Sequence, residues 1–161
     1  MNQKKIANLG LFAAVAIIFG YVESLVPYFA EIPGMKLGLA NLAVLFILEK
    51  YTWKEAALVS AVRIIVIGFM FGNLFSILYS LAGAALSLTV MTFMKKKSGF
   101  SILGISVAGG VSHNIGQLII AGLITMTSGL IYYAPALLIS GVITGLLIGT
   151  LTGEVLKRIR F

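Results

Sequence analysis

The sequence predicts an all-α membrane protein, a bundle of six transmembrane helices that forms a single domain over residues 1–161. Hydrophobic residues make up 60% of the chain, charged residues only 11%, and the mean hydropathy is +1.07. A soluble domain is charged at about a quarter of its residues, so this much apolar surface requires lipid. The second observation is that basic residues recur at regular intervals between apolar stretches.

Six apolar stretches define the expected helices, and their lengths differ. A straight membrane crossing takes about 20 residues, so the second and third stretches are short and the last two are long. A short stretch beside a polar loop can begin below the membrane surface. The expected spans are Ile6–Pro27, Met35–Leu48, Ala56–Phe71, Leu74–Met94, Ile102–Met126 and Leu130–Leu156.

The basic residues predict the orientation of this bundle. Ten of the twelve Lys and Arg residues lie before the first span, between the second and third, after the fourth, or after the sixth. These segments share one side of a six-span protein, which the positive-inside rule places in the cytoplasm together with both termini. Topology thus explains the net charge of +7, and we expect no nucleic-acid partner. The ten are Lys4, Lys5, Lys50, Lys54, Lys95, Lys96, Lys97, Lys157, Arg158 and Arg160.

Small residues recur every fourth position in three spans, a spacing that lets helix backbones approach closely. In the fifth and sixth spans we expect this spacing to serve packing within one bundle. In the first span it serves either the bundle or a partner protein. The residues concerned are Gly104, Ala108, Ser112 and Gly116, then Gly141, Gly145, Gly149 and Gly153, and in the first span Gly10 with Ala14 or Ala16 with Gly20.

Polar residues gather in the outer half of the predicted bundle and suggest a ligand pocket open to the outside. Arg63 is the central one, because a charge near mid-membrane costs a few kcal/mol unless something pairs with it. Its planar fork of donors suits a carboxylate or a phosphate, so an anionic or carbonyl-rich ligand is expected. The candidate substrate-binding residues are Glu23, Lys36, Asn41, Arg63, Tyr79, His113, Asn114 and Gln117.

A polar stretch, Glu31 to Asn41, interrupts the first apolar half. It contains the Pro33-Gly34 turn signal, so we expect residues 28–35 to act as a lid with Pro33 and Gly34 as its hinge.

Structural alternatives remain open for the same residues. Arg63 can pair with Glu23 to hold the bundle together, and Lys36 can point into water rather than into the pocket. His113, Asn114 and Gln117 can form a hydrogen-bonded clamp between helices. Tyr132 and Tyr133 fit ordinary aromatic residues of the membrane interface.

The sequence lacks residues on which several kinds of catalysis and metal binding depend. The chain has no Cys and no Asp, a single His and no G-x-x-x-x-G-K-[ST] loop. It also has no clustered carboxylates of the kind that bind magnesium. We therefore expect no metal site, no bound cofactor and no enzymatic activity.

Four segments occur in order and together resemble one family: IPGMKLGLANLAVLF, SAVRIIVIG, LYSLAGAALS and VAGGVSHNIGQLIIAGL. The chain resembles the bacterial Gx transporter family, also labelled heptaprenyl diphosphate synthase component I. That family is similar to the substrate-binding S components of energy-coupling-factor importers. The resemblance implies a multi-pass protein of the bacterial cytoplasmic membrane that captures a small molecule from outside. It also places Lys36, Asn41, Arg63, His113, Asn114 and Gln117 at the family's motif positions.

The resemblance also implies partners. S components dock through small residues of their first helix on a coupling membrane protein that two ATPases drive. An alternative is a non-catalytic accessory subunit of isoprenoid or quinone metabolism, and a third possibility is a transporter that works alone. Gly10 and Ala14, or Ala16 and Gly20, match the docking motif only loosely.

Overall fold

The computed structural model describes residues 3–25, 38–97, 99–126 and 128–158. These residues form six α-helices and one short 3-10 helix, so the all-α prediction is confirmed. The elements are α1 (Gln3–Leu25), α2 (Leu39–Lys50), α3 (Trp53–Phe71), α4 (Leu74–Lys96), α5 (Ile102–Thr125), η2 (Ser128–Tyr133) and α6 (Ala134–Arg158).

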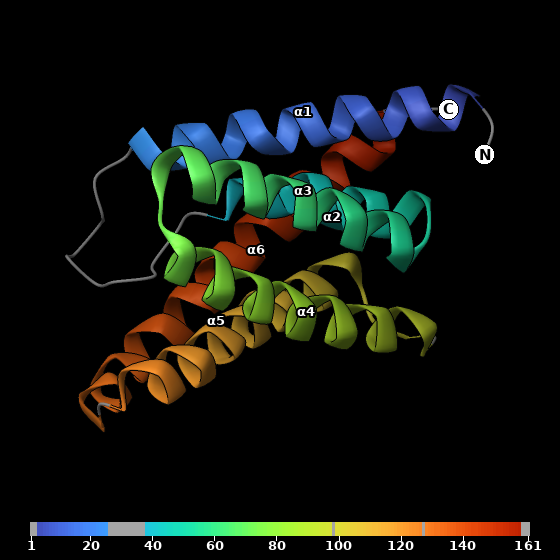
Figure 1. Ribbon diagram of the computed structural model, residues 1–161. Coiled ribbons are helices and arrows are strands. Elements are labelled where there is room, and N and C mark those ends of the chain that lie inside the picture. Colours follow the sequence, from blue (N-terminus) through green and yellow to red (C-terminus); the bar gives the residue numbers. More distant parts are fainter. Residues whose placement is uncertain (1–2, 26–37, 98, 127, 159–161) are drawn as a thin grey trace.

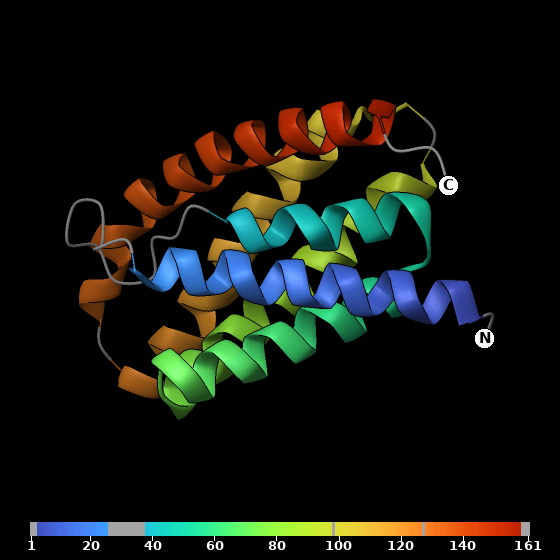
Figure 2. The same cartoon turned by 90° about the horizontal axis from the view of Figure 1, so that it is seen from above.

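The helices form two groups of three that are joined through α2 and α3 (Figure 1). In the C-terminal group, α5 packs along both α4 and α6 over most of its length. In the N-terminal group, α1, α2 and α3 all contact one another. The groups meet where α3 contacts α4 and where α2 contacts α6. Seen from above, α2 lies inside the bundle between α1 and α6 (Figure 2).

Helix α2 is short and central. Its residues from Ala43 to Leu48 are all buried, so no face of this stretch is left for lipid. A helix that is apolar all round belongs in an interior. Its 12 residues span about 18 Å, well short of the roughly 30 Å of a bilayer's hydrocarbon core. The expectation of a short second helix is confirmed.

Within the described residues, four helices are long and apolar enough to cross a membrane, namely α1, α4, α5 and α6. The 19-residue helix α3 carries three charged residues, Lys54, Glu55 and Arg63. The structure therefore describes a multi-pass membrane protein. Crossing by all six helices, and the side on which the termini lie, stay predictions.

The start of the sixth helix differs from the prediction. Residues 130–133 belong to η2, and α6 begins only at Ala134. Two local features explain the difference. Met126 adopts a positive φ of 49° and ends α5, and Pro135 lies in the first turn of α6, where its missing N–H costs no hydrogen bond. The third helix begins earlier than expected, at Trp53, because the side chain of Glu55 accepts from the Thr52 backbone N–H at 3.0 Å.

The glycine spacing of α6 packs against α5, as expected. A Cβ added at Gly145 would lie 2.6 Å from Cα of Val107, and one added at Gly141 would lie 3.0 Å from the backbone of Gly110. Gly149 meets Leu103 in the same way, whereas an added Cβ at Gly153 would meet nothing within 4 Å. Three of the four glycines therefore bring the α5 and α6 backbones together.

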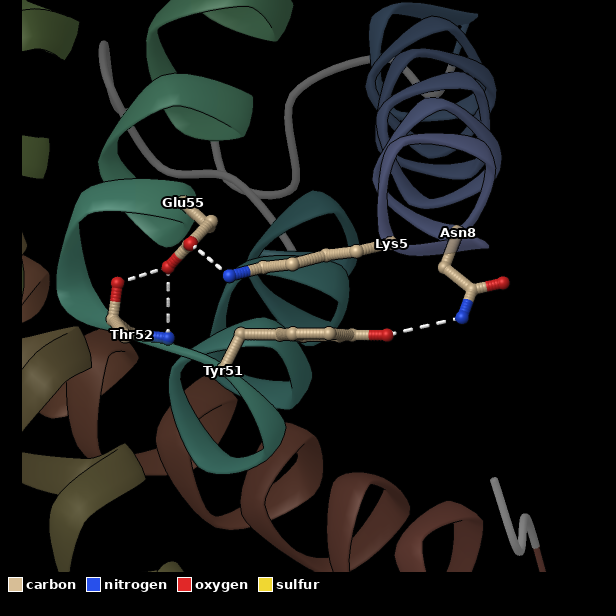
Figure 3. Close-up of polar contacts among 5 residues, drawn as sticks. All are labelled: Lys5, Asn8, Tyr51, Thr52 and Glu55. Atoms are coloured by element: carbon tan, nitrogen blue, oxygen red, sulfur yellow. Dashed lines mark hydrogen bonds and ion pairs between the residues drawn. The ribbon is translucent and has the colours of Figure 1, made fainter. Parts of the chain in front are cut away.

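The basic residues collect at one end of the bundle, which we call the lysine-rich end. It comprises the start of α1, the α2–α3 turn, the α4–α5 connection and the end of α6 (Figures 1 and 2). Figure 3 shows how two of these elements are fastened together. The Lys5 ammonium lies 2.5 Å from the Glu55 carboxylate, and Asn8 donates to the Tyr51 hydroxyl at 3.1 Å. The described basic residues here are Lys4, Lys5, Lys50, Lys54, Lys95, Lys96, Lys97, Lys157 and Arg158.

Candidate functional site

Arg63 lies on α3 and reaches across to the first turn of α2. Its Nη2 donates to Oδ1 of Asn41 at 2.8 Å. Its Nε is buried and has no hydrogen-bond partner among the residues that the structure describes. Buried donors are nearly always paired in folded proteins, so an unpaired guanidinium nitrogen calls for a specific explanation. A ligand acceptor is one such explanation.

Glu23, near the end of α1, also contacts α2. Its Oε1 accepts from the backbone N–H of Leu39 at 2.7 Å, the first residue of the helix. A carboxylate at this position satisfies a free N–H and matches the positive end of the helix dipole. The Glu23 carboxylate is thus bound to the start of α2.

Glu23 and Arg63 form no direct ion pair in the described residues, although the charge of Glu23 acts electrostatically on Arg63. Each of the two residues has its hydrogen bond to α2 instead. We call Glu23, the Leu39 N–H, Asn41 and Arg63 the Arg63 cluster. It unites three of the sequence-predicted site residues at the end of the bundle opposite the lysines.

Gly38 explains where α2 begins. It precedes the helix with φ 74°, a left-handed conformation that glycine adopts without strain. Its carbonyl accepts from the Asn41 N–H at 2.8 Å. A Cβ at Gly38 would lie 3.9 Å from Cβ of Thr144, which places the start of α2 beside α6. The Arg63 cluster therefore borders on α1, α2, α3 and α6.

His113 and Gln117 lie where α5 meets α4. A Cβ added at Gly83 would lie 2.7 Å from the His113 carbonyl oxygen and 2.8 Å from Cγ of Gln117. Gln117 is 7% exposed. The two residues lie four positions apart on one face of α5, and that face is turned toward α4. Tyr79, also on α4, is half-buried.

Asn114 faces the other neighbour of α5. Its Nδ2 donates to the Leu137 carbonyl of α6 at 2.6 Å. Leu137 lies seven residues from Thr144, about 10 Å along α6. The described structure therefore separates the predicted residues into two groups, the Arg63 cluster and a second group on α4 and α5. Of the three residues in the clamp alternative, Asn114 forms a hydrogen bond between helices.

Three predicted residues, Lys36 and the hinge pair Pro33 and Gly34, lie outside the described residues, as does the lid at residues 28–35.

The two candidate docking pairs of α1 differ. Ala16 is fully buried, and a Cβ at Gly20 would lie 2.9 Å from the Ile67 side chain of α3. Gly10 and Ala14 are exposed, and an added Cβ at Gly10 would meet nothing within 4 Å. Ala16 and Gly20 serve the bundle, and the outward-facing pair is Gly10 with Ala14.

Sequence reasoning misses two features of the structure. The first is the Leu39 N–H, a backbone group for which only the glycine before the helix gives a hint. The second is a hollow of about 480 Å³ beyond the end of α5, lined by Thr125, Gly129, Leu130, Tyr132 and Tyr133. The sequence pattern indicates the two tyrosines only as interface residues. Tyr132 is 88% exposed, as an interface aromatic would be.

No group of three or more His, Cys, Asp or Glu residues that could hold a metal ion occurs in the part of the chain that the structure describes. The donors of the Arg63 cluster are a guanidinium, an amide and a backbone N–H, which suit an anion rather than a cation.

Comparison with known proteins identifies the family. The model of the heptaprenyl diphosphate synthase component I family matches residues 12–155. Searches of curated proteins and of solved structures gave no match. The family match includes every residue of the Arg63 cluster, the second polar group on α4 and α5, and most of α1. Because it extends over nearly the whole chain, this protein belongs to the heptaprenyl diphosphate synthase component I family.

Proposed function

We propose that this protein is the substrate-capture subunit of an energy-coupling-factor-type importer. It binds a small, anionic and partly apolar molecule at the end of the bundle opposite the lysines, which is the external end in the predicted topology. The observation that carries the proposal is Arg63, whose buried Nε has no partner in the described part of the chain while its Nη2 donates to Asn41. A fixed guanidinium with free donors is suited to an anion.

The surroundings support an apolar body for that ligand. Arg63 lies one residue before the buried Ile64, which belongs with Ile77 and Ala84 to a small apolar cluster between α3 and α4. His113 and Gln117 lie on the α5 face that meets Gly83 of the same helix α4. The bundle therefore offers apolar side chains and a few neutral donors besides the charge of Arg63, the usual composition of small-molecule sites.

Transport requires partners in this proposal. The chain has no phosphate-binding loop, so energy must come from an ATPase pair acting through a coupling membrane protein. The exposed pair Gly10 and Ala14 on α1 is the proposed contact, because small residues on a lipid-facing helix allow close approach of another helix. We further propose that the chain itself catalyses no reaction.

A second candidate function follows from the family's name. The description heptaprenyl diphosphate synthase component I favours a non-catalytic accessory subunit that presents an isoprenoid diphosphate to a soluble synthase. The two candidate functions require different partner proteins. The importer needs an ATPase pair with a coupling protein, and the accessory subunit needs a prenyl synthase. Gentle purification from the native membrane, followed by mass spectrometry of the co-purifying proteins, distinguishes them.

The central test concerns the ligand. The protein is purified in mild detergent, and the small molecules that it retains are identified by native mass spectrometry. Arg63→Ala is expected to lose the retained molecule while keeping its helical circular dichroism. Lys54→Ala, at the lysine-rich end, is the matched control for removal of a cation and keeps the molecule. Equal retention by wild type and Arg63→Ala would contradict the proposal.

A further inference from the structure

We propose that Glu23 determines the charge of the accepted ligand and restricts the Arg63 cluster to a single negative charge, a carboxylate rather than a diphosphate. This inference rests on the proposed function and deepens it by naming the ligand class and a specificity-determining residue. It begins from the observation that Glu23 and Arg63 share one site without pairing directly.

Glu23 is held in place by α2. Its Oε1 accepts the Leu39 N–H at 2.7 Å, at the positive end of a helix whose following residues are buried. A carboxylate that accepts from the first N–H group of a helix lies at the positive end of the helix dipole and keeps its position. Its negative charge therefore remains beside the guanidinium when a ligand arrives.

The charges of the Arg63 cluster can compensate little negative charge on a ligand. Among the described residues of this site, Arg63 contributes one positive charge and Glu23 one negative charge. A ligand with two or three negative charges would bring uncompensated charge next to Glu23. Such repulsion is strong where water is scarce.

The donors of Arg63 also fit a carboxylate. Nη2 donates to the neutral Asn41 side chain, and the buried Nε has no partner in the described ranges. A guanidinium binds a carboxylate through two parallel N–H groups, so Nε and a neighbouring N–H group suit the two oxygens of one carboxylate. A diphosphate needs several cations or a metal, and no metal-binding group of acidic residues exists in the described ranges.

The competing explanation is that Glu23 is only a helix cap. Glu23→Gln separates the two roles, because the glutamine carbonyl can still accept the Leu39 N–H while the charge is lost. Glu154→Gln is the matched control. It removes one exposed carboxylate at the lysine-rich end, where Glu154 pairs with Lys157 at 2.8 Å.

The experiment measures binding of three probes to the full chain in phosphatidylcholine nanodiscs by isothermal titration calorimetry at constant ionic strength. The probes are hexanoate, hexyl diphosphate and the neutral hexanol. Wild type is expected to bind hexanoate at least tenfold more tightly than hexyl diphosphate. In Glu23→Gln this ratio falls at least tenfold, mainly because hexyl diphosphate binds more tightly, and in Glu154→Gln the ratio is unchanged.

The outcomes separate this inference from the proposed function. Wild type that prefers hexyl diphosphate, or a Glu23→Gln ratio equal to that of wild type, overturns the charge selection by Glu23. A change of the same size in Glu154→Gln overturns it as well, because net charge would then be the cause. If hexanoate binds wild type no more tightly than hexanol, the anion site itself is refuted. The wild-type preference keeps the inference testable even if a variant does not fold.

Discussion

Asn41 and Arg63 are joined by a hydrogen bond of 2.8 Å that connects the first turn of α2 to the middle of α3. A neutral amide thus holds the guanidinium in place without cancelling its charge. Asn41 opens a helix whose start is fixed by Gly38 and whose first N–H is bound by Glu23. The relationship makes Asn41 the residue that positions Arg63, and it can be tested separately from Arg63 itself.

Two substitutions of Asn41 separate binding from stability: Asn41→Asp is expected to weaken ligand binding, and Asn41→Ala is expected to destabilise the fold. The aspartate forms an ion pair with Arg63, so hexanoate affinity falls at least tenfold while the melting temperature is kept or raised. The alanine leaves a buried guanidinium nitrogen without its acceptor and costs about 2 kcal/mol of unfolding free energy. Calorimetry and thermal unfolding in the same detergent measure the two effects. Tighter hexanoate binding by Asn41→Asp would contradict the positioning role.

The glycines of α6 allow a comparison within one helix. Gly145→Ala should lower the free energy of unfolding by about 1–3 kcal/mol, because its Cβ would lie 2.6 Å from Cα of Val107 and backbone cannot yield cheaply. Gly153→Ala belongs to the same four-residue spacing but meets nothing within 4 Å, so it should be neutral or slightly stabilising. Unfolding in increasing dodecyl sulfate measures both. Equal losses would show that helix propensity, not packing, decides.

The helices are largely predictable from the sequence, and the reason is the alternation of apolar runs with lysines. The turn between α2 and α3 contains Lys50 and Lys54, and these two lysines are enough to indicate its position. The start of α2 is not predictable in this way. Gly38 lies inside the apolar run that follows Lys36, and nothing in that run reveals a left-handed residue. It lies beside α6, where a Cβ at Gly38 would be 3.9 Å from Cβ of Thr144, a neighbour far away in the sequence.

The site is predictable in its residue types and not in its pairings. A buried arginine is conspicuous in any membrane sequence because of its cost, and Arg63 stands out for that reason. The sequence leads us to expect Glu23 either to line the pocket or to pair with Arg63, and its partner is the Leu39 backbone N–H. Asn114 groups with His113 and Gln117 in the sequence, yet neighbouring residues on a helix point about 100° apart. Its amide consequently binds α6.

The link between α2 and α4 should be important for stability. Lys95 donates from α4 to the carbonyl oxygens of Leu48 and, at 2.9 Å, Glu49, and it pairs with the Glu49 carboxylate at 3.5 Å. These carbonyls end α2 and have no partner within the helix. Lys95→Met is expected to cost about 2 kcal/mol of unfolding free energy. The exposed neighbour Lys96→Met serves as control and should change it by less than about 0.5 kcal/mol.

Acid should weaken the contact between α1 and α3. The pKa of Glu55 is lowered from 4.5 to about 2, chiefly by the Lys5 side chain and then by Thr52. A carboxyl group whose pKa is lower in the folded state stabilises the fold above its unfolded pKa. That contribution is therefore complete above about pH 4.5 and is lost as the pH falls toward 2.

Glu55→Gln tests this dependence. The variant should unfold at a lower temperature than wild type near neutral pH, and the difference should shrink steadily between pH 4.5 and pH 2. Lys5→Met should reduce the same pH dependence, because it removes the main cause of the shift. The measurement is thermal unfolding as a function of pH, followed by circular dichroism. A difference from wild type that stays constant over this range would contradict the assignment to Glu55.

Thr152 offers a stabilising substitution. Its side chain on α6 is fully buried, and its Oγ1 has no hydrogen-bond partner among the described residues. An unsatisfied buried hydroxyl costs free energy, whereas a methyl group of similar shape does not, so Thr152→Val should raise the free energy of unfolding by about 1 kcal/mol. Thr150→Val is the control, because Thr150 is exposed and donates to the Leu146 carbonyl at 2.8 Å. Thr150→Val should not raise the free energy of unfolding. Thr152→Val that destabilises the protein would instead reveal a polar partner of this hydroxyl in the membrane, such as an enclosed water.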